Sequence, residues 1–317
     1  MTTISKTLYI VVPSYNEKDV LHETATRLEV KLTKLIHKNT ISPHSRILFV
    51  DDGSKDTTWT IVESLSKKNP DLFGGIKLSR NQGHQNALLA GLITARESAD
   101  VIISMDADLQ DDIGAIDKML TAHANGAEIV YGVRSARKKD TFFKKITAQG
   151  FYNLMSKLGV DSVYNHADYR LMTKRAVSEL EHFKEVNLFL RGIIPLLGFN
   201  TAIVEYERAE RFAGESKYPL KKMLNFAIDG ITSFSVKPLR IVTSLGFFVS
   251  IISLLIMLYA VVSKIAGYAV EGWTFTILSV WFIGGVQMLS LGIVGEYIGK
   301  IYNEVKARPR FIIEKKI

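Results

Sequence analysis

The chain has 317 residues, of which 47% are hydrophobic and 23% charged, with a formal net charge of +8 at pH 7. This length predicts roughly two domains of about 150 residues each. The absence of cysteine excludes disulfides and thiol chemistry. Residues 216–317 hold 12 Lys or Arg against 5 Asp or Glu, a balance of +7 beside two apolar segments. Because the excess charge flanks apolar segments, we expect a membrane surface as its partner and no nucleic acid.

The first two thirds of the chain alternate short apolar runs with helix-like segments. Strands are predicted over LYIVV, ILFV, GIKLS, VIISM, EIVYGV and TAIVEYE. Helices are predicted near 18–37, from about 57, over NALLAGLITA, near 113–125 and from about 142. This alternation favours a Rossmann-like α/β domain with a mostly parallel sheet covered on both faces. The first run is too short for a signal peptide, so we expect this domain to stay in the cytosol.

Three of the predicted strands are followed by unusual polar sequences. These are PSYNE at 13–17, DDGS at 51–54 and DADLQ at 106–110. Ligands bind outside the carboxyl ends of parallel strands, which share one edge of the sheet. We therefore expect the three sequences to form one crevice.

The third sequence begins a stretch with four aspartates in the seven residues 106–112. Carboxylates at the edge of a core are costly unless positive charge meets them. In an extended segment Asp106 and Asp108 face the same way, and two such hard oxygen ligands suit Mg²⁺ or Mn²⁺. Aspartate also favours helix N-termini, and we assign that simpler role to Asp111 and Asp112.

The last third contains two segments that predict transmembrane helices. Residues 241–262 and 273–295 carry no charge, and each is about the ~20 residues that a helix needs to cross a bilayer. Basic residues flank the pair, while the connection KIAGYAVEG has one Lys and one Glu. The positive-inside rule therefore predicts that both flanks are cytoplasmic. The amphipathic segment from Pro219 to Pro238 predicts a helix lying in the membrane interface.

PSYNE, DDGS and DADLQ in this order resemble the family 2 glycosyltransferases, whose nucleotide-sugar domain has the fold called GT-A. The motifs RNQGHQNALLAG, YGVRSARK, ADYRLM, RFAGESKYPLKK and GEYIGKIYNEVKARP are similar to those of polyprenyl-phosphate glycosyltransferases. This group includes dolichol-phosphate mannose synthases and, closer to this chain, bacterial undecaprenyl-phosphate glucosyltransferases with two C-terminal transmembrane helices. The resemblance covers nearly the whole chain. One departure is Asp111-Asp112-Ile113-Gly114, where family members usually have DPPE, and it alters the start of the helix after the metal loop.

The resemblance implies transfer of a hexose, glucose first, from a UDP-sugar to undecaprenyl (polyprenyl) phosphate with inversion at the anomeric carbon. N-acetylglucosamine, galactose and mannose remain alternative sugars. It further implies Mg²⁺ or Mn²⁺ as cofactor, and a bacterial plasma membrane location with both termini cytoplasmic. A flippase and a downstream glycosyltransferase are implied as partners in modifying a cell-wall glycan, lipopolysaccharide or teichoic acid. Two lone helices leave room for a homo-oligomer.

These expectations divide the chain into three parts. Residues 1–216 form the cytosolic GT-A domain, 217–238 lie in the bilayer interface, and 239–317 hold the two transmembrane helices and a basic cytosolic tail.

The resemblance also assigns site residues. The acceptor phosphate is a dianion and already nucleophilic, so the site needs cations to hold it more than it needs a strong base. Metal ligands are Asp106, Asp108 and Gln110, and the catalytic set is Asp168, Asp108, Arg211 and Lys217. Donor and phosphate contacts are Pro13, Tyr15, Glu17, Asp51, Asp52, His84, Asp106, Gln110, Arg134, Arg137, Arg170 and Ser216.

Several of these residues have simpler interpretations. Arg134 and Arg137 also fit surface charges, Lys217 fits a side chain that snorkels at the interface, and His84 fits a helix start. Asp168 also fits a plain ion pair with Arg170.

Three other function classes are alternatives to a polyprenyl-phosphate glycosyltransferase. A processive polysaccharide synthase of the same fold would carry Gln-x-x-Arg-Trp, but no Arg precedes Trp59, Trp273 or Trp281. A sugar-nucleotide pyrophosphorylase would have a Gly-rich loop in place of PSYNE. A membrane module that binds UDP without turnover stays open, although intact Asp106 and Asp168 argue against it.

Overall fold

A computed structural model describes residues 5–135, 166–186, 188–209, 235–267 and 272–317. The predicted helix from about 142 lies outside the described residues, as does the predicted interfacial helix apart from 235–238. The chain divides into two compact units, a sheet domain and a pair of long helices. Each is described by itself.

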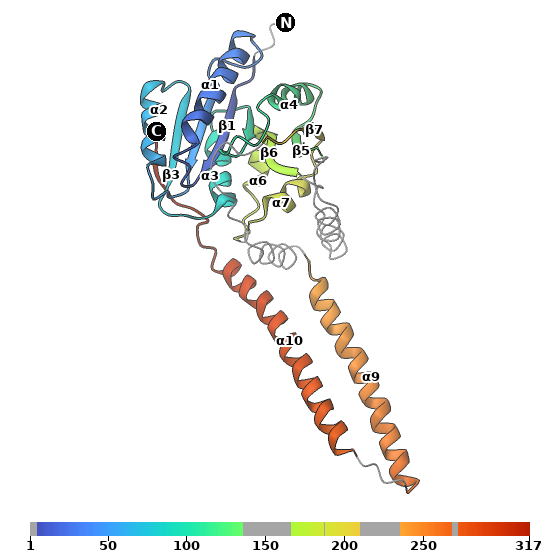
Figure 1. Cartoon of the computed structure of the whole chain (residues 1–317). Coiled ribbons are helices and arrows are strands. Elements are labelled where there is room, and N and C mark those ends of the chain that lie inside the picture. The colour runs from blue at the N-terminus through green and yellow to red at the C-terminus, as the bar shows by residue number, and fades with distance from the viewer. Residues whose placement is uncertain (1–4, 136–165, 187, 210–234, 268–271) are drawn as a thin grey trace. The chain divides into compact units, whose positions relative to one another are not determined.

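The sheet domain is built on eight strands in the order β7-β5-β6-β4-β1-β2-β3-β8 (Figure 1). Their bounds are Leu8–Ser14 (β1), Arg46–Asp51 (β2), Phe73–Leu78 (β3), Val101–Ser104 (β4), Ile129–Arg134 (β5), His166–Thr173 (β6), Thr201–Tyr206 (β7) and Ile313–Lys316 (β8). Neighbours from β4 through β3 are parallel, and so are β5 and β7. The sheet is therefore mostly parallel, as predicted. The sequence did not predict β6 and β8, which run antiparallel to their neighbours.

Six helices described in this domain connect or follow the strands. They are Leu21–His37 (α1), Thr58–Lys68 (α2), His84–Arg96 (α3), Ala115–Ala124 (α4), Lys174–Leu180 (α6) and Leu190–Leu196 (α7). Leu8, Ile10 and Val12 of β1 share a buried cluster with the apolar face of α1. Val11 points to the other face, where a Cβ on Gly91 of α3 would lie 2.4 Å from its Cγ1. Helices therefore cover both faces, and glycine lets α3 approach closely.

The register of the strands explains why the polar sequences share one edge. Ser14 at the end of β1 pairs with Asp51 at the end of β2, and Val11 pairs with Ser104 at the end of β4. Because β6 is antiparallel, its first residues lie at this same edge. Arg170 pairs with Ser104, so Asp168 lies beside the residues that follow β4.

The C-terminal tail returns to the sheet domain. It was predicted only as a basic tail, but β8 pairs with β3 at the edge of the sheet. Ile317 and Gly75 exchange backbone hydrogen bonds, with N–O distances of 2.9 and 3.1 Å. Residues 308–317 thus belong to the sheet domain and not to the helical pair.

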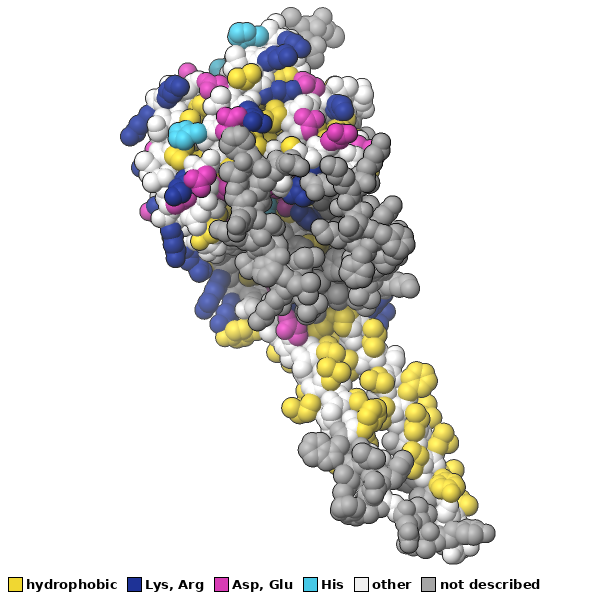
Figure 2. All heavy atoms as spheres, viewed as in Figure 1, with side chains coloured by type: hydrophobic (Ala, Val, Ile, Leu, Met, Phe, Trp, Pro, Cys, Tyr) yellow, Lys and Arg dark blue, Asp and Glu magenta, His cyan; other side chains and the backbone are white. Residues whose placement is uncertain are grey.

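The second unit contains the long helices Lys237–Ile265 (α9) and Trp273–Val305 (α10). Both are long and apolar enough to cross a membrane, with candidate spans at Lys237–Ile256 and Phe282–Val305. Their described apolar side chains are largely exposed, and they gather along both helices in Figure 2. So much exposed apolar surface is typical of contact with lipid. The two helices agree with the predicted pair and indicate membrane association.

Candidate active site

The segment DADLQ forms a tight loop after β4. Leu109 has a left-handed backbone, with φ of 58°. The Thr24 hydroxyl of α1 donates to the Ala107 carbonyl at 2.7 Å, and the Gln110 N–H donates to Asp108 Oδ1 at 3.1 Å. The loop is thus fixed from α1 and by its own second aspartate. It leaves the Asp106 side chain 32% exposed.

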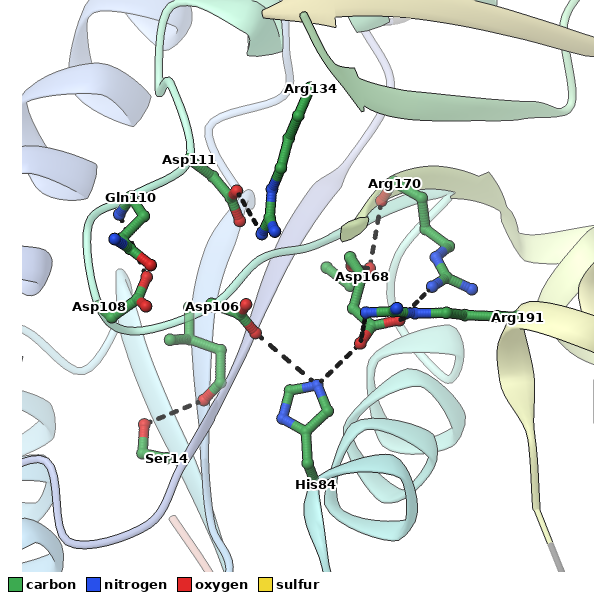
Figure 3. Close-up of polar contacts among 12 residues, drawn as sticks. Ser14, His84, Asp106, Asp108, Gln110, Asp111, Arg134, Asp168, Arg170 and Arg191 are labelled. Carbon is green, nitrogen blue, oxygen red and sulfur yellow. Dashed lines mark hydrogen bonds and ion pairs between the residues drawn. The ribbon is translucent and has the colours of Figure 1, made fainter. Parts of the chain in front are cut away.

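Asp106 lies among charged neighbours at the crevice (Figure 3). Its pKa is raised to about 6, chiefly by burial; the charges of Asp111, Asp168 and Asp108 act in the same direction, and His84 opposes them. His84 Nε2 lies 3.7 Å from Asp106 Oδ1 and 3.3 Å from Asp168 Oδ2. The imidazole therefore bridges the DADLQ loop and β6.

Asp168 is held by two arginines as well as by His84. Arg170 Nη2 lies 2.5 Å from its Oδ1, and Arg191 places Nε 3.3 Å from Oδ1 and Nη2 3.2 Å from Oδ2. Although burial alone would raise the pKa of Asp168, the hydrogen bond from His84 and the two guanidinium charges hold that pKa well below its usual value. Asp168 is therefore ionised at neutral pH and poorly suited to act as a general base.

His84 is positioned by contacts from two other loops. Asp52 accepts hydrogen bonds from the backbone N–H groups of Gln82 and Gly83, at 2.7 and 2.9 Å. Gln85 Oε1 accepts from the Leu190 N–H at 2.7 Å. The DDGS loop, the start of α3 and the start of α7 are thus joined around the imidazole.

The remaining residues of PSYNE and DDGS lie beside this crevice. Pro13 and Asp51 are buried at the ends of β1 and β2, Tyr15 is 40% exposed and Glu17 is partly buried. Asp51 Oδ2 accepts from the Ser54 N–H at 3.3 Å, whereas Oδ1 has no hydrogen-bond partner within the described part of the chain. Such an oxygen suits a donor group on a ligand.

Gly53 allows the DDGS turn. Its φ is +65°, and a Cβ there would lie 2.5 Å from the Arg80 carbonyl carbon. Both the left-handed backbone and the close approach require glycine.

The prediction that Asp111 caps a helix is wrong. Its side chain is buried, and Oδ1 accepts from the Tyr206 hydroxyl at 2.5 Å and from Arg134 Nη2 at 3.5 Å. Burial raises the pKa of Asp111, which these two donors oppose. Asp112 lies in the turn before α4, where it accepts from the Gly114 N–H at 2.7 Å, but its side chain does not cap the helix, whose N-cap is Gly114. This turn stands where the family usually has two prolines.

Two further predicted residues have defined partners. Gln110 Oε1, the oxygen predicted to bind the metal, accepts a hydrogen bond from Arg208. Arg170 is fully buried beneath Asp168, which gives it a positioning role in place of the predicted contact with a ligand. Four predicted residues lie outside the described residues: Arg137, Arg211, Ser216 and Lys217.

No sequence motif singled out Arg191, Arg208 or Tyr206. Arg191 is a lone charge in the apolar helix LRGIIPL, which is the one signal that could have singled it out. Tyr206 is the last residue of β7 and Arg208 follows this strand, and neither belongs to a sequence motif.

Within the described ranges no group of three or more His, Asp or Glu side chains is arranged to hold a metal ion. Asp106 and Asp108 provide two carboxylates. Mg²⁺ typically uses one or two carboxylates together with substrate phosphates. The carboxylates that raise the pKa of Asp106 leave an excess of negative charge that a divalent cation would offset.

Comparisons with known proteins identify the family of this chain. Residues 9–181 match the family described as Glycosyl transferase family 2, and residues 237–301 match the GtrB C-terminal hairpin. The uncharacterized glycosyltransferase YkoT of Bacillus subtilis is 53% identical, over 97% of this chain and 91% of that protein. The SfII prophage-derived bactoprenol glucosyl transferase of Shigella flexneri is 39% identical, over 96% and 97%. Among solved structures, mannosyl-3-phosphoglycerate synthase from Rubrobacter xylanophilus is 17% identical over 71% of each chain, with a TM-score of 0.48.

Proposed function

The chain belongs to glycosyl transferase family 2, and we propose that it moves a hexosyl group, glucose first, from a UDP-sugar to polyprenyl phosphate at a membrane surface. The observation that carries the proposal is a group of cations around Asp168 beside the carboxylates of the DADLQ loop, in a chain that also has two long apolar helices. The glucosyl group and the lipid acceptor are supported by the name of the Shigella relative.

The reaction requires little proton chemistry. An acceptor phosphate oxygen forms a bond to the anomeric carbon while the bond from that carbon to the β-phosphate oxygen breaks. UDP leaves with the bonding electrons, and attack from the opposite side turns an α-linked donor into a β-linked product. A phosphate monoester has a second pKa of about 6 and is largely dianionic at neutral pH. An ionised Asp168 that accepts no proton fits this reaction.

Asp106 and Asp108 would hold Mg²⁺ or Mn²⁺, completed by the oxygens of the donor diphosphate. The bound ion would neutralise charge on the β-phosphate as UDP leaves. Asp51, whose Oδ1 has no partner in the described ranges, and Tyr15 with Glu17 would hold the nucleoside.

The connectivity supports one orientation in the membrane. Both ends of the α9–α10 hairpin continue into the sheet domain, through β7 before it and β8 after it. The sheet domain and residues 308–317 would then lie on one side, which the basic flanks make the cytoplasmic side. The lipid-linked sugar would form on that side, so use on the other side would need a flippase and a second transferase.

The proposal is tested with purified protein in detergent, undecaprenyl phosphate and labelled UDP-glucose, UDP-galactose, UDP-N-acetylglucosamine or GDP-mannose. We expect label in the organic phase from one sugar with Mg²⁺ and none with EDTA. Asp106→Asn should lower the rate at least ~100-fold by removing a metal ligand. Asp117→Asn is the control, because Asp117 lies on the surface of α4 and pairs with Lys31.

Transfer from no sugar, with UDP still bound, would refute the proposal in favour of a non-catalytic UDP-binding module.

A further inference from the structure

Two guanidiniums share the carboxylate of Asp168. Arg170 and Arg191 both contact it, and a guanidinium stays protonated in proteins. Asp106, the other carboxylate beside His84, belongs to the loop that would hold the metal. A guanidinium that shares its carboxylate with a second one and also reaches solvent can form further charge-assisted hydrogen bonds to an anionic ligand.

The two arginines differ in what they can reach. The Arg170 side chain is 1% exposed, whereas the Arg191 side chain is 32% exposed. Asp168 holds the Arg191 fork through two contacts, at 3.2 and 3.3 Å. Held in this way, the guanidinium loses little side-chain freedom when a ligand binds. Arg191 is therefore the arginine of the pair that can contact an anion.

Arg191 and the DADLQ loop lie on opposite sides of His84. Figure 3 shows Asp108 and Gln110 on one side, Arg191 on the other, and His84 between Asp106 and Asp168. Arg134, by contrast, donates hydrogen bonds to Asp111 and to the hydroxyl of Tyr206 at the end of β7. The reaction brings two anions together, the donor diphosphate and the acceptor phosphate. The metal would compensate the charge of the diphosphate. The second anion needs a cation beyond His84.

We propose that Arg191 binds the phosphate of the lipid acceptor, with Asp168 and the buried Arg170 fixing the guanidinium in place. This inference rests on the proposed function, because it takes its second anion from the transfer reaction. Its chemistry is a guanidinium fork on a phosphate monoester. The bond from that phosphate to the anomeric carbon then forms as described above, and Arg191 exchanges no proton.

The test compares Arg191→Gln and Arg191→Lys with wild type at varied concentrations of each substrate. We expect Arg191→Gln to raise the KM for polyprenyl phosphate about 10- to 100-fold, the value of a charge-assisted hydrogen bond. The KM for the UDP-sugar and the Kd for UDP should stay within about twofold, and Lys should recover part of the loss. Arg175→Gln is the control, since Arg175 is 68% exposed and pairs with Glu128 on the surface.

A second measurement does not depend on turnover. Farnesyl phosphate, a soluble phosphate monoester, should bind to wild type and bind at least ~10-fold more weakly to Arg191→Gln, while the melting temperatures of the two proteins match. If wild type transfers no sugar but this difference is found, the proposed function fails and the anion site stands. An unchanged affinity for farnesyl phosphate, or an equal rise in the KM for the UDP-sugar, would overturn the assignment of Arg191.

Discussion

Arg170 is a buried cation whose one ion pair among the described side chains is with Asp168. Its Nη2 contacts Asp168, while Nε and Nη1 have no hydrogen-bond partner within the described residues. Removing one partner of a buried ion pair typically costs about 3–5 kcal/mol, because the other charge is left without compensation. The ion pair of Arg170 with Asp168 thus affects both the stability of the sheet domain and the proposed active site.

We therefore expect Asp168→Asn to lose transfer activity and also about 3–5 kcal/mol of unfolding free energy. Replacing both partners removes the unpaired charge, so Asp168→Asn with Arg170→Met should regain most of the stability and none of the activity. Thermal unfolding in detergent and the transfer assay measure the two effects. Equal melting temperatures for wild type and Asp168→Asn would show that the charge of Arg170 is met elsewhere.

At the scale of elements, β8 closes the edge of the sheet. Beyond the ladder, three backbone hydrogen bonds join this segment to β3 and the residue after it, namely Ile317 with Gly75 in both directions and Ser79 with Ile312. An uncovered edge strand exposes unpaired N–H and C=O groups and favours aggregation. The tail therefore contributes to the fold of the sheet domain, although the two long apolar helices lie between that domain and the tail in the sequence.

Deleting residues 312–317 should lower the unfolding free energy by about 1.5–4.5 kcal/mol from the three hydrogen bonds outside the ladder alone, at roughly 0.5–1.5 kcal/mol for each. Lys315→Ala with Lys316→Ala is the matched control. It removes the ion pairs with Glu63 and Glu97 and keeps the backbone pairing. Both lysines are exposed, so each ion pair contributes little to the unfolding free energy. Comparable losses in the deletion and the control, measured by thermal unfolding, would show that charge and not strand pairing holds the tail.

The same elements show how far sequence reasoning reaches. Strands β1, β2 and β4 are apolar runs, so the convergence of Asp51, Asp52 and Asp106 at one edge could be predicted. Strand β6 carries a buried arginine within it, and β8 reads IEKK, so neither shows an apolar pattern. The resemblance placed Asp168 in the site, but the antiparallel strand β6 that brings it to this edge, and Arg191 with it, was not indicated by the sequence.

Asp111 was misassigned for a related reason. A surface cap and a buried acid look alike in sequence, and the donors that stabilise this one come from distant strands.

At the scale of the whole molecule, the connectivity restricts the membrane topology. A hairpin whose two ends both continue into one folded domain must begin and end on the same side of the bilayer. Each helix contains a candidate span of 20 or more residues, enough to cross about 30 Å of hydrocarbon. The connection between them, residues 266–272, should therefore face the opposite side.

The absence of cysteine makes this orientation directly measurable, because one introduced thiol is then the only one in the chain. Ala266→Cys should react with a membrane-impermeant maleimide in intact bacterial cells. Asn125→Cys, at the exposed end of α4, and Arg308→Cys, in the returning tail, should react only after the membrane is permeabilised. Labelling of Asn125→Cys in intact cells would reverse the orientation. Labelling that differs between Asn125→Cys and Arg308→Cys would separate the tail from the sheet domain and contradict the pairing of β8 with β3.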